Sequence, residues 1–213
     1  MALPPPLARA TVASLLLTSC ATHQGALAVG DASTTLVGFD AEQRVLFERT
    51  LRDIEGLEAS TLAIDADDYR TASTFARTFG FDFDGPALLA WWSRRVHRVR
   101  VDDAWTVAVY DGEHTIAVTE AFFALDPLER IYALVHEARH ADGDGYRHAD
   151  CPASAGRRLA GTAACDDRPD GAYTFQAALL FELYAYGLVD PAGARVAWLS
   201  TKRRIINAAP PSN

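Results

Sequence analysis

The stretch Val135-His136-Glu137-Ala138-Arg139-His140 contains the pattern His-Glu-x-x-His. In a helix, residues i and i+4 lie one above the other on the same face, so the imidazoles of His136 and His140 can both reach one metal ion. Glu137 lies about 100° further around the helix, where a carboxylate can act on a metal-bound water without being a ligand. A zinc hydrolase needs this arrangement, with Glu137 as the general base. We therefore expect a zinc-dependent, peptidase-like site.

The residues around the motif predict that it lies on a helix anchored in the core. Asp126-Pro127-Leu128-Glu129 supplies an N-cap aspartate, a proline at the first helical position and a glutamate at N3. Gly143 and Gly145 are typical of the end of a helix. An apolar stripe then follows helical spacing: Leu128, Ile131, Leu134, Val135 and Ala138.

Length and composition indicate one compact domain. The chain has 213 residues, of which 49% are hydrophobic, and this is enough for a sizeable core. Its 20 basic and 28 acidic residues give a net charge of −8, with no basic stripe to neutralise phosphates. This balance argues against nucleic acid as a partner. No apolar run approaches the roughly 20 residues that span a bilayer.

The N-terminus carries the signals of an exported lipoprotein. Leu17-Thr18-Ser19-Cys20 resembles a bacterial lipobox, in which cleavage occurs before a cysteine that then carries the lipid. An ordinary secretory signal and a buried N-terminal helix are the alternatives. Ala21 follows the cysteine, which by resemblance to Gram-negative lipoproteins indicates the outer membrane, facing the periplasm. We expect a signal peptide over residues 1–19 and a lipidated Cys20 that begins a flexible tether over 20–36.

The cysteine count agrees with export. Lipidation of Cys20 leaves Cys151 and Cys165 as a pair, which an oxidising periplasm would allow to form a disulfide. Closing a loop of about 15 residues contributes about 3 kcal/mol in the chain-entropy model. Two buried free thiols or two soft zinc ligands are the alternatives, but the wide spacing disfavours a structural zinc site. We expect the disulfide.

Periodicity predicts an α+β domain over residues 37–207, mostly helical, followed by a disordered tail over 208–213. Between residues 96 and 119 the period changes from helical to two, which predicts three short antiparallel strands just before the motif helix. Helical spacing or capping signals predict the other helices, over about 41–56, 67–80, 86–95, 173–186 and 190–206.

Over about residues 115–148 the strand, loop and capped helix resemble the zincin metallopeptidases. The metzincin branch continues the motif as His-Glu-x-x-His-x-x-Gly-x-x-His. Gly143 matches its glycine, but Tyr146 stands at the place of the third histidine, and His148 follows two residues later. The resemblance implies a zincin-like fold, one zinc ion, and hydrolysis of peptide or other amide bonds.

The chain is also similar to a group of uncharacterised bacterial proteins. They carry His-Glu-Ala-Arg-His, a Gly-rich turn, a histidine shortly before a cysteine, and a Gly-Ala-aromatic-x-x-Gln segment. Here His148 precedes Cys151, and Gly171-Ala172-Tyr173 is followed by Gln176. The resemblance strengthens the predicted site more than it defines a substrate. Together with Tyr146, Gln176 is expected near the metal or the substrate.

Three candidates compete for the third metal ligand that a catalytic zinc site usually has. His148 offers the preferred donor, follows a chain reversal and lies close to the expected disulfide. Glu182 lies in an apolar helix, where an unpaired carboxylate is costly and needs the metal or an arginine as its partner. Asp142 and Asp144 are the third option, although solvated turn residues are the simpler interpretation. We favour His148 because of its ligand type and its reach.

Arg139 has two possible roles. It could support the site by pairing with Asp142, Asp166 or Glu182. It could instead bind a substrate carboxylate or steady an oxyanion.

These features predict a membrane-anchored zinc hydrolase that acts on a peptide or another envelope substrate. The alternative is a non-enzymatic envelope lipoprotein or binding module whose metal is structural. A structural site would be closed by four protein ligands, whereas a catalytic site keeps a position for water and needs Glu137.

Overall fold

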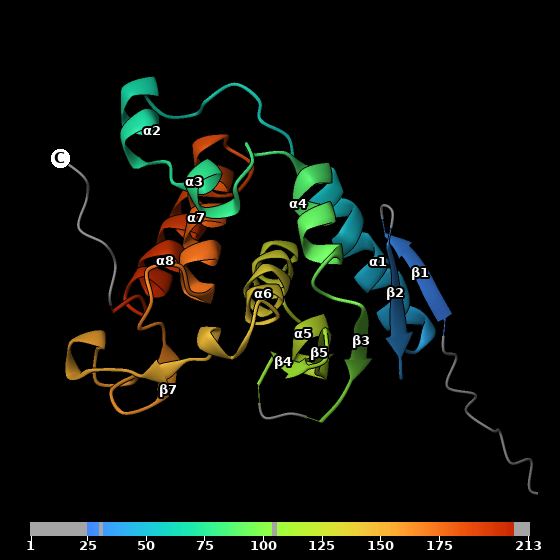
Figure 1. The fold of residues 1–213 in the computed structure, drawn as a ribbon. Coiled ribbons are helices and arrows are strands. Elements are labelled where there is room, and N and C mark those ends of the chain that lie inside the picture. Colours follow the sequence, from blue (N-terminus) through green and yellow to red (C-terminus); the bar gives the residue numbers. More distant parts are fainter. Residues whose placement is uncertain (1–24, 30–31, 104–105, 207–213) are drawn as a thin grey trace, which may run out of the picture.

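The computed structural model of the chain describes residues 25–29, 32–103 and 106–206 (Figure 1). The fold is α+β, with about half of the chain helical and one small mixed sheet beside the helices. The predicted signal peptide over 1–19, the predicted lipidation of Cys20 and the predicted tail over 208–213 lie outside the described residues.

The main sheet has five strands in the order β1-β2-β3-β5-β4. The pairs β1/β2 and β4/β5 are antiparallel, whereas β2/β3 and β3/β5 are parallel, so the prediction of an antiparallel sheet is wrong. Its strands are β1 (Gly25–Val29), β2 (Ala32–Val37), β3 (Arg98–Val101), β4 (Ala108–Gly112) and β5 (Thr115–Val118).

Burial explains why the order of β4 and β5 is inverted relative to the chain. All four residues of β5 are buried, and such a strand needs a neighbour on each side. Strand β4 alternates between buried and more exposed residues, which suits an edge. The chain therefore passes from β3 to the edge strand and returns through a hairpin to the central position, where β5 runs parallel to β3.

The segment predicted as a flexible tether, residues 20–36, contributes two strands from Gly25 on. Strand β2 is held tightly, because Thr34 and Leu36 are fully buried and the Thr34 hydroxyl donates to the Val96 carbonyl at 3.1 Å. Small, polar residues had suggested a tether, but the buried Thr34 and Leu36 alternate with more exposed residues of β2.

Eight helices occur among the described residues, and five of them have nine or more residues. These five are α1 (Ala41–Glu55), α4 (Gly85–Ser93), α6 (Pro127–His140), α7 (Ala172–Ala185) and α8 (Pro191–Lys202). The short ones are α2 (Ala66–Ala72), α3 (Phe75–Phe79) and α5 (Glu120–Phe123). The single helix predicted over 67–80 is divided, because Ser73 has an extended backbone and turns its hydroxyl toward Glu182.

Helix α6 lies in the middle of the molecule (Figure 1). It packs against β4, α1 and α4 on one side and against α7 on the other, and α7 in turn contacts α3 and α8. Large buried side chains fill these layers, among them Phe47, Trp92, Phe122, Leu134 and Leu179. The helix that carries the motif is therefore fixed by packing on both sides.

A small hairpin beyond the C-terminal end of α6 completes the fold. Its strands are β6 (Ala149–Asp150) and β7 (Ala163–Cys165), which pair in antiparallel fashion. A disulfide joins Cys151 to Cys165, as predicted, and both cysteines are buried. Short 3-10 turns over Asp144–Tyr146 and Ala153–Ala155 lead into the hairpin and connect its strands.

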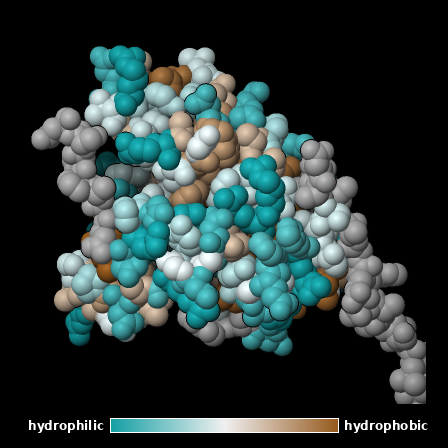
Figure 2. Space-filling view, viewed as in Figure 1, coloured by the Kyte–Doolittle hydropathy of each residue, from teal (hydrophilic) through white to brown (hydrophobic). Residues whose placement is uncertain are grey.

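The surface gives no sign of a membrane span in the described part of the chain. No helix there is both long enough and apolar enough to cross a bilayer. The face shown in Figure 2 is mostly hydrophilic, and its hydrophobic residues occur in small groups.

Candidate metal centre

Helix α6 begins with the predicted capping box. The Asp126 carboxylate accepts from the Glu129 backbone N–H at 2.8 Å, and the Glu129 side chain accepts from the Asp126 N–H at 3.3 Å. Pro127 occupies the first turn. These contacts satisfy helix-terminal donors that would otherwise lack a partner. With Leu134 and Val135 fully buried, the rotation of α6 is fixed and its histidines face the loop that follows the helix.

Three histidines converge at the end of α6. His136 Nε2 lies 3.1 Å from His148 Nε2 and 3.3 Å from His140 Nε2. A metal-ligating atom of each residue lies within 4.8 Å of the other two. Zinc–nitrogen bonds of about 2.0–2.1 Å in a tetrahedral site put two nitrogens roughly 3.3 Å apart. The cluster therefore fits a metal ion, and His148 belongs to it, as the sequence predicted.

The outer contacts of two rings determine where their protons lie. His140 Nδ1 lies 2.5 Å from the Tyr146 carbonyl oxygen, which can only accept, so Nδ1 carries the proton. His148 Nδ1 faces the Asp166 carboxylate at 3.1 Å and donates in the same way. In a neutral imidazole the Nε2 of each ring then presents a lone pair. These two lone pairs are available to a cation between the rings.

Burial favours the neutral form of His136 and of His140. It lowers the pKa of His136 far below its usual range, and the neighbouring His140 and His148 lower it further. Burial also lowers the pKa of His140 to about 4, again with a contribution from His148. Metal ions bind the neutral form of histidine, so the environment favours the state that a ligand needs.

Gln176 and Tyr146 both contact the histidines, as expected. Gln176 is buried and donates to the Thr201 hydroxyl at 3.0 Å. Its interaction with His136 raises the pKa of His136 and so opposes part of the decrease caused by burial. His136 Nδ1 nevertheless has no partner in hydrogen-bonding geometry among the described residues. Tyr146 contributes its carbonyl to His140, while its ring packs against an arginine.

Glu137 lies beside the histidines without belonging to their cluster. Its Oε2 accepts from the Tyr110 backbone N–H of β4 at 2.8 Å. Burial raises the pKa of Glu137 to about 8, and the hydrogen bond from Tyr110 opposes this shift. Glu137 and His136 line the same cavity, so the carboxyl group is directed toward a space that a substrate can enter.

This cavity has a volume of about 1430 Å³ and lies along α6, α7 and α8. It is large enough for a peptide segment or a drug-sized molecule. Apolar side chains form much of its wall, including those of Leu57, Leu128, Ile131, Leu183 and Val189. The polar groups His136, Glu137, Tyr173, Gln176 and Arg204 also line it.

The alternative third ligands lie elsewhere. Glu182 accepts from the Tyr69 hydroxyl at 2.9 Å and from Ser73 at 2.5 Å, because it lies about 9 Å further along α7 than Gln176. The cationic partner expected for Glu182 is thus replaced by two hydroxyl groups. Asp142 forms ion pairs with two arginines, and Asp144 pairs with a third.

Arg139 supports the loop that carries His148. It pairs with Asp142, as one prediction stated, and its Nε donates to the Asp170 carbonyl at 2.9 Å. Its guanidinium lies 3.7 Å from the Tyr146 ring centroid and 4.4 Å from that of Phe175. Arg139 forms no ion pair with Asp166 or Glu182 and does not line the cavity described above. The expected role in substrate binding receives no support from this position.

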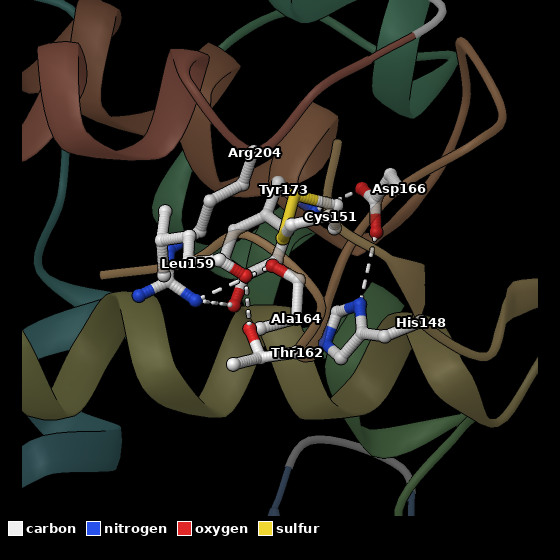
Figure 3. The surroundings of a disulfide bond; sticks show 9 residues. His148, Cys151, Leu159, Thr162, Ala164, Asp166, Tyr173 and Arg204 are labelled. Atoms are coloured by element: carbon white, nitrogen blue, oxygen red, sulfur yellow. Dashed lines mark hydrogen bonds and ion pairs between the residues drawn. A yellow bond between two sulfur atoms is a disulfide. The ribbon is translucent and has the colours of Figure 1, made fainter. Parts of the chain in front are cut away.

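Asp166, Tyr173 and Arg204 complete the surroundings of the histidines (Figure 3). The Asp166 carboxylate accepts one hydrogen bond from His148 Nδ1 and another from the Tyr173 backbone N–H, the latter at 2.6 Å. The Tyr173 ring centroid lies 4.4 Å from that of His136 and 4.9 Å from that of His148. The Tyr173 hydroxyl accepts from Arg204 at 2.8 Å.

Sequence reasoning found these three residues only in part. The sequence indicated Asp166 only as a possible partner of Arg139, and Tyr173 only as part of a shared segment. This reasoning missed Arg204, because an arginine in a C-terminal turn carries no motif that connects it to residues far away in the chain.

Comparisons of the chain with models of protein families, with curated proteins and with solved structures found no match.

Proposed function

We propose that the protein is a zinc-dependent hydrolase that cleaves peptide or other amide bonds in the cell envelope. One observation carries this proposal: three histidine side chains converge in metal-binding geometry, and one of them, His136, lines with Glu137 a cavity that can hold a substrate. The spacing of the nitrogens suits zinc, and the Nε2 lone pairs of His140 and His148 are available to a cation.

The chemistry divides between the metal and Glu137. A zinc ion held by His136, His140 and His148 would act as a Lewis acid and bring the pKa of a water molecule toward 7. Burial alone favours the protonated form of Glu137, and a cation held by the histidines would favour its carboxylate. In that form Glu137 would take the proton of the attacking water and pass it to the leaving nitrogen. Asp166 holds His148 in the tautomer and orientation that a ligand needs.

The number of ligands favours catalysis over a structural role. A structural zinc site has four protein ligands, whereas the described residues offer a cluster of three histidines. Cys151 and Cys165 are oxidised to a disulfide and so cannot supply thiolates. The three-ligand set leaves a coordination position for water.

Zinc content and hydrolysis test the proposal separately. The purified protein should bind one zinc ion, His148→Ala should lose it, and Glu182→Ala should keep it. Glu137→Gln should keep its zinc and lose hydrolysis of a peptide pool, with the products followed by mass spectrometry. Zinc retained by His148→Ala, or activity retained by Glu137→Gln, would contradict the assigned roles.

The cellular place of this activity follows from the lipobox-like stretch at Leu17-Thr18-Ser19-Cys20. The Cys151–Cys165 disulfide supports export, because such bonds persist in an oxidising compartment. Labelling with a palmitate analogue should mark the full-length chain and not Cys20→Ser. Equal labelling of both proteins, or of neither, would argue against lipidation at Cys20.

A further inference from the structure

Arg204 places a positive charge in the same cavity as His136 and Glu137. It follows the C-terminal end of α8 and is half-buried. Figure 3 shows its guanidinium on the far side of Tyr173 from His148. The Tyr173 ring contacts two of the histidines, and its hydroxyl meets the guanidinium, so one side chain separates Arg204 from the proposed metal.

No described residue neutralises the charge of Arg204. Its Nη1 donates to the Tyr173 hydroxyl at 2.8 Å and to the Ala164 carbonyl at 3.3 Å, and both acceptors are neutral. Among the described residues, no carboxylate lies within 4.0 Å of its guanidinium. Asp166 is connected to Arg204 through its backbone, but its two carboxylate oxygens accept from His148 and from the Tyr173 N–H.

The side chain is nevertheless held in place. The Arg204 carbonyl accepts from the Asp166 N–H at 2.7 Å, and the Ile206 N–H donates to the Asp166 carbonyl at 3.0 Å. The guanidinium lies 5.1 Å from the Tyr173 ring centroid. Nε and Nη2 make no hydrogen bond to any described residue, so this fixed group keeps donors for a ligand. A planar guanidinium suits a carboxylate, which it can bind through two parallel hydrogen bonds.

Apart from Glu137, the acidic residues of the cavity lie near the starts of α6 and α8 or, in the case of Asp53, near the end of α1. Asp126 and Glu129 form the capping box at the start of α6, and Asp126 precedes His136 by roughly 15 Å of helix. Asp190 caps the start of α8, whereas Arg204 follows its end. An anionic group on a bound molecule is therefore attracted to the end of the cavity where the histidines lie.

We propose that Arg204 forms a carboxylate-binding subsite, and that the preferred substrates carry a carboxylate close to the bond that is cleaved. The carboxylate is either the free C-terminus of a peptide or an acidic side chain near the scissile bond. This inference rests on the proposed hydrolase function, because only a hydrolase would treat the bound molecule as a substrate. The binding subsite itself can be tested without turnover.

Calorimetry on the zinc-loaded Glu137→Gln protein provides this test. Three versions of one short, N-acetylated apolar peptide serve as probes: a C-terminal acid, a C-terminal amide, and an amide with glutamate as the last residue. A charge-assisted bond to Arg204 should make the better carboxylate peptide bind about tenfold more tightly than the plain amide. The comparison of the two carboxylate peptides shows which source the subsite takes.

Adding Arg204→Gln should abolish this preference. Arg203→Gln is the matched control, because Arg203 is the adjacent, exposed arginine and does not line the cavity; it should leave the preference unchanged. Arg204→Met keeps the aliphatic stem and serves as a second charge-free variant if the first does not fold.

Three outcomes would overturn the inference: equal binding of all three peptides, a preference that survives Arg204→Gln, or a preference lost equally in Arg203→Gln. A merely structural Arg204 would weaken binding of acid and amide by the same factor, which also overturns it. If Glu137→Gln shows the preference but the zinc-loaded protein with Glu137 in place hydrolyses nothing, the proposed function is contradicted and the subsite is left intact.

Discussion

His148 lies two residues beyond Tyr146, which occupies the place of the third histidine in the metzincin motif. The turn before His148 explains how it still reaches His136. Gly143 has a φ of 132°, which favours glycine, and a 3-10 turn over Asp144–Tyr146 follows it. This turn directs the Tyr146 carbonyl to His140 and brings the chain back far enough for His148 Nε2 to meet His136. The offset from the metzincin spacing is thus taken up by the local geometry of the turn.

Asp166 gives a prediction at the same scale. Asp166→Asn should weaken zinc binding by roughly 10–100-fold, because the amide no longer provides a charged acceptor for the His148 Nδ1–H. Competition with a chromophoric chelator measures the affinity. Asp150→Asn, an exposed aspartate two residues from His148, is the matched control and should bind zinc as the unaltered protein does. Equal affinities for the two variants would contradict the role of Asp166.

At the scale of elements, the sequence predicted the features that local signals determine, namely where helices begin and which residues share a helix face. The capping boxes at Asp40 and Asp126 mark the first residues of α1 and α6, and the spacing of His136 and His140 places both on one face. The order of β3, β5 and β4 was not predictable in this way. It depends on which strand is buried on both faces, and short strands of similar composition do not reveal this property.

The candidate site divides along the same line. His136, Glu137, His140 and the disulfide followed from motifs, and His148 followed from ligand type and reach. The position of Glu182 beside Tyr69 and Ser73 depends on how α2 packs against α7. Such contacts between distant segments leave no periodic signal in the chain.

The hairpin of β6 and β7 connects the disulfide to the metal centre. Cys151 follows His148 by three residues, and Cys165 directly precedes Asp166, so the bond joins the segment of a proposed ligand to that of its hydrogen-bond partner (Figure 3). Reduction should therefore lower zinc affinity while the helices persist, and replacing both cysteines by alanine should lower the free energy of unfolding by about 3 kcal/mol.

Zinc release, followed with a chelator, measures the zinc affinity. Far-ultraviolet circular dichroism shows whether the helices persist and, with urea, measures the free energy of unfolding. The variant with both cysteines replaced controls for the reductant, because reductant should change nothing in it. Zinc affinity that is equal in the oxidised and reduced protein would show that the hairpin holds His148 without the disulfide.

At the scale of the whole molecule, Glu182 links a peripheral element to the core. Helix α2 buries none of its own residues, yet Tyr69 and the adjoining Ser73 both donate to this fully buried carboxyl group on α7. No positive group pairs with Glu182 among the described residues within ion-pair distance. Burial consequently raises the pKa of Glu182, although the two hydroxyl donors oppose the shift.

This pKa makes the stability of the protein depend on pH in a definite direction. Below the ordinary glutamate pKa the folded and unfolded states both hold the proton. As pH rises from there to the higher folded pKa, the unfolded chain ionises first, which favours unfolding by about 1.4 kcal/mol for each unit between the two pKa values. The contribution of Glu182 to the free energy of unfolding therefore falls with rising pH and is lowest above the folded pKa.

Glu182→Gln removes this titration and keeps a side chain that can bond to both hydroxyls. Urea unfolding of the two proteins from about pH 4 to pH 7 should show the variant gaining stability relative to the unaltered protein, by on the order of 1 kcal/mol at the upper end. Glu55→Gln, at an exposed position on α1, controls for the change from glutamate to glutamine itself. A Glu182→Gln difference that stays constant with pH would mean that the carboxyl group ionises equally easily in both states. In that case the two hydroxyl donors, rather than burial, would control the charge at the contact between α2 and α7.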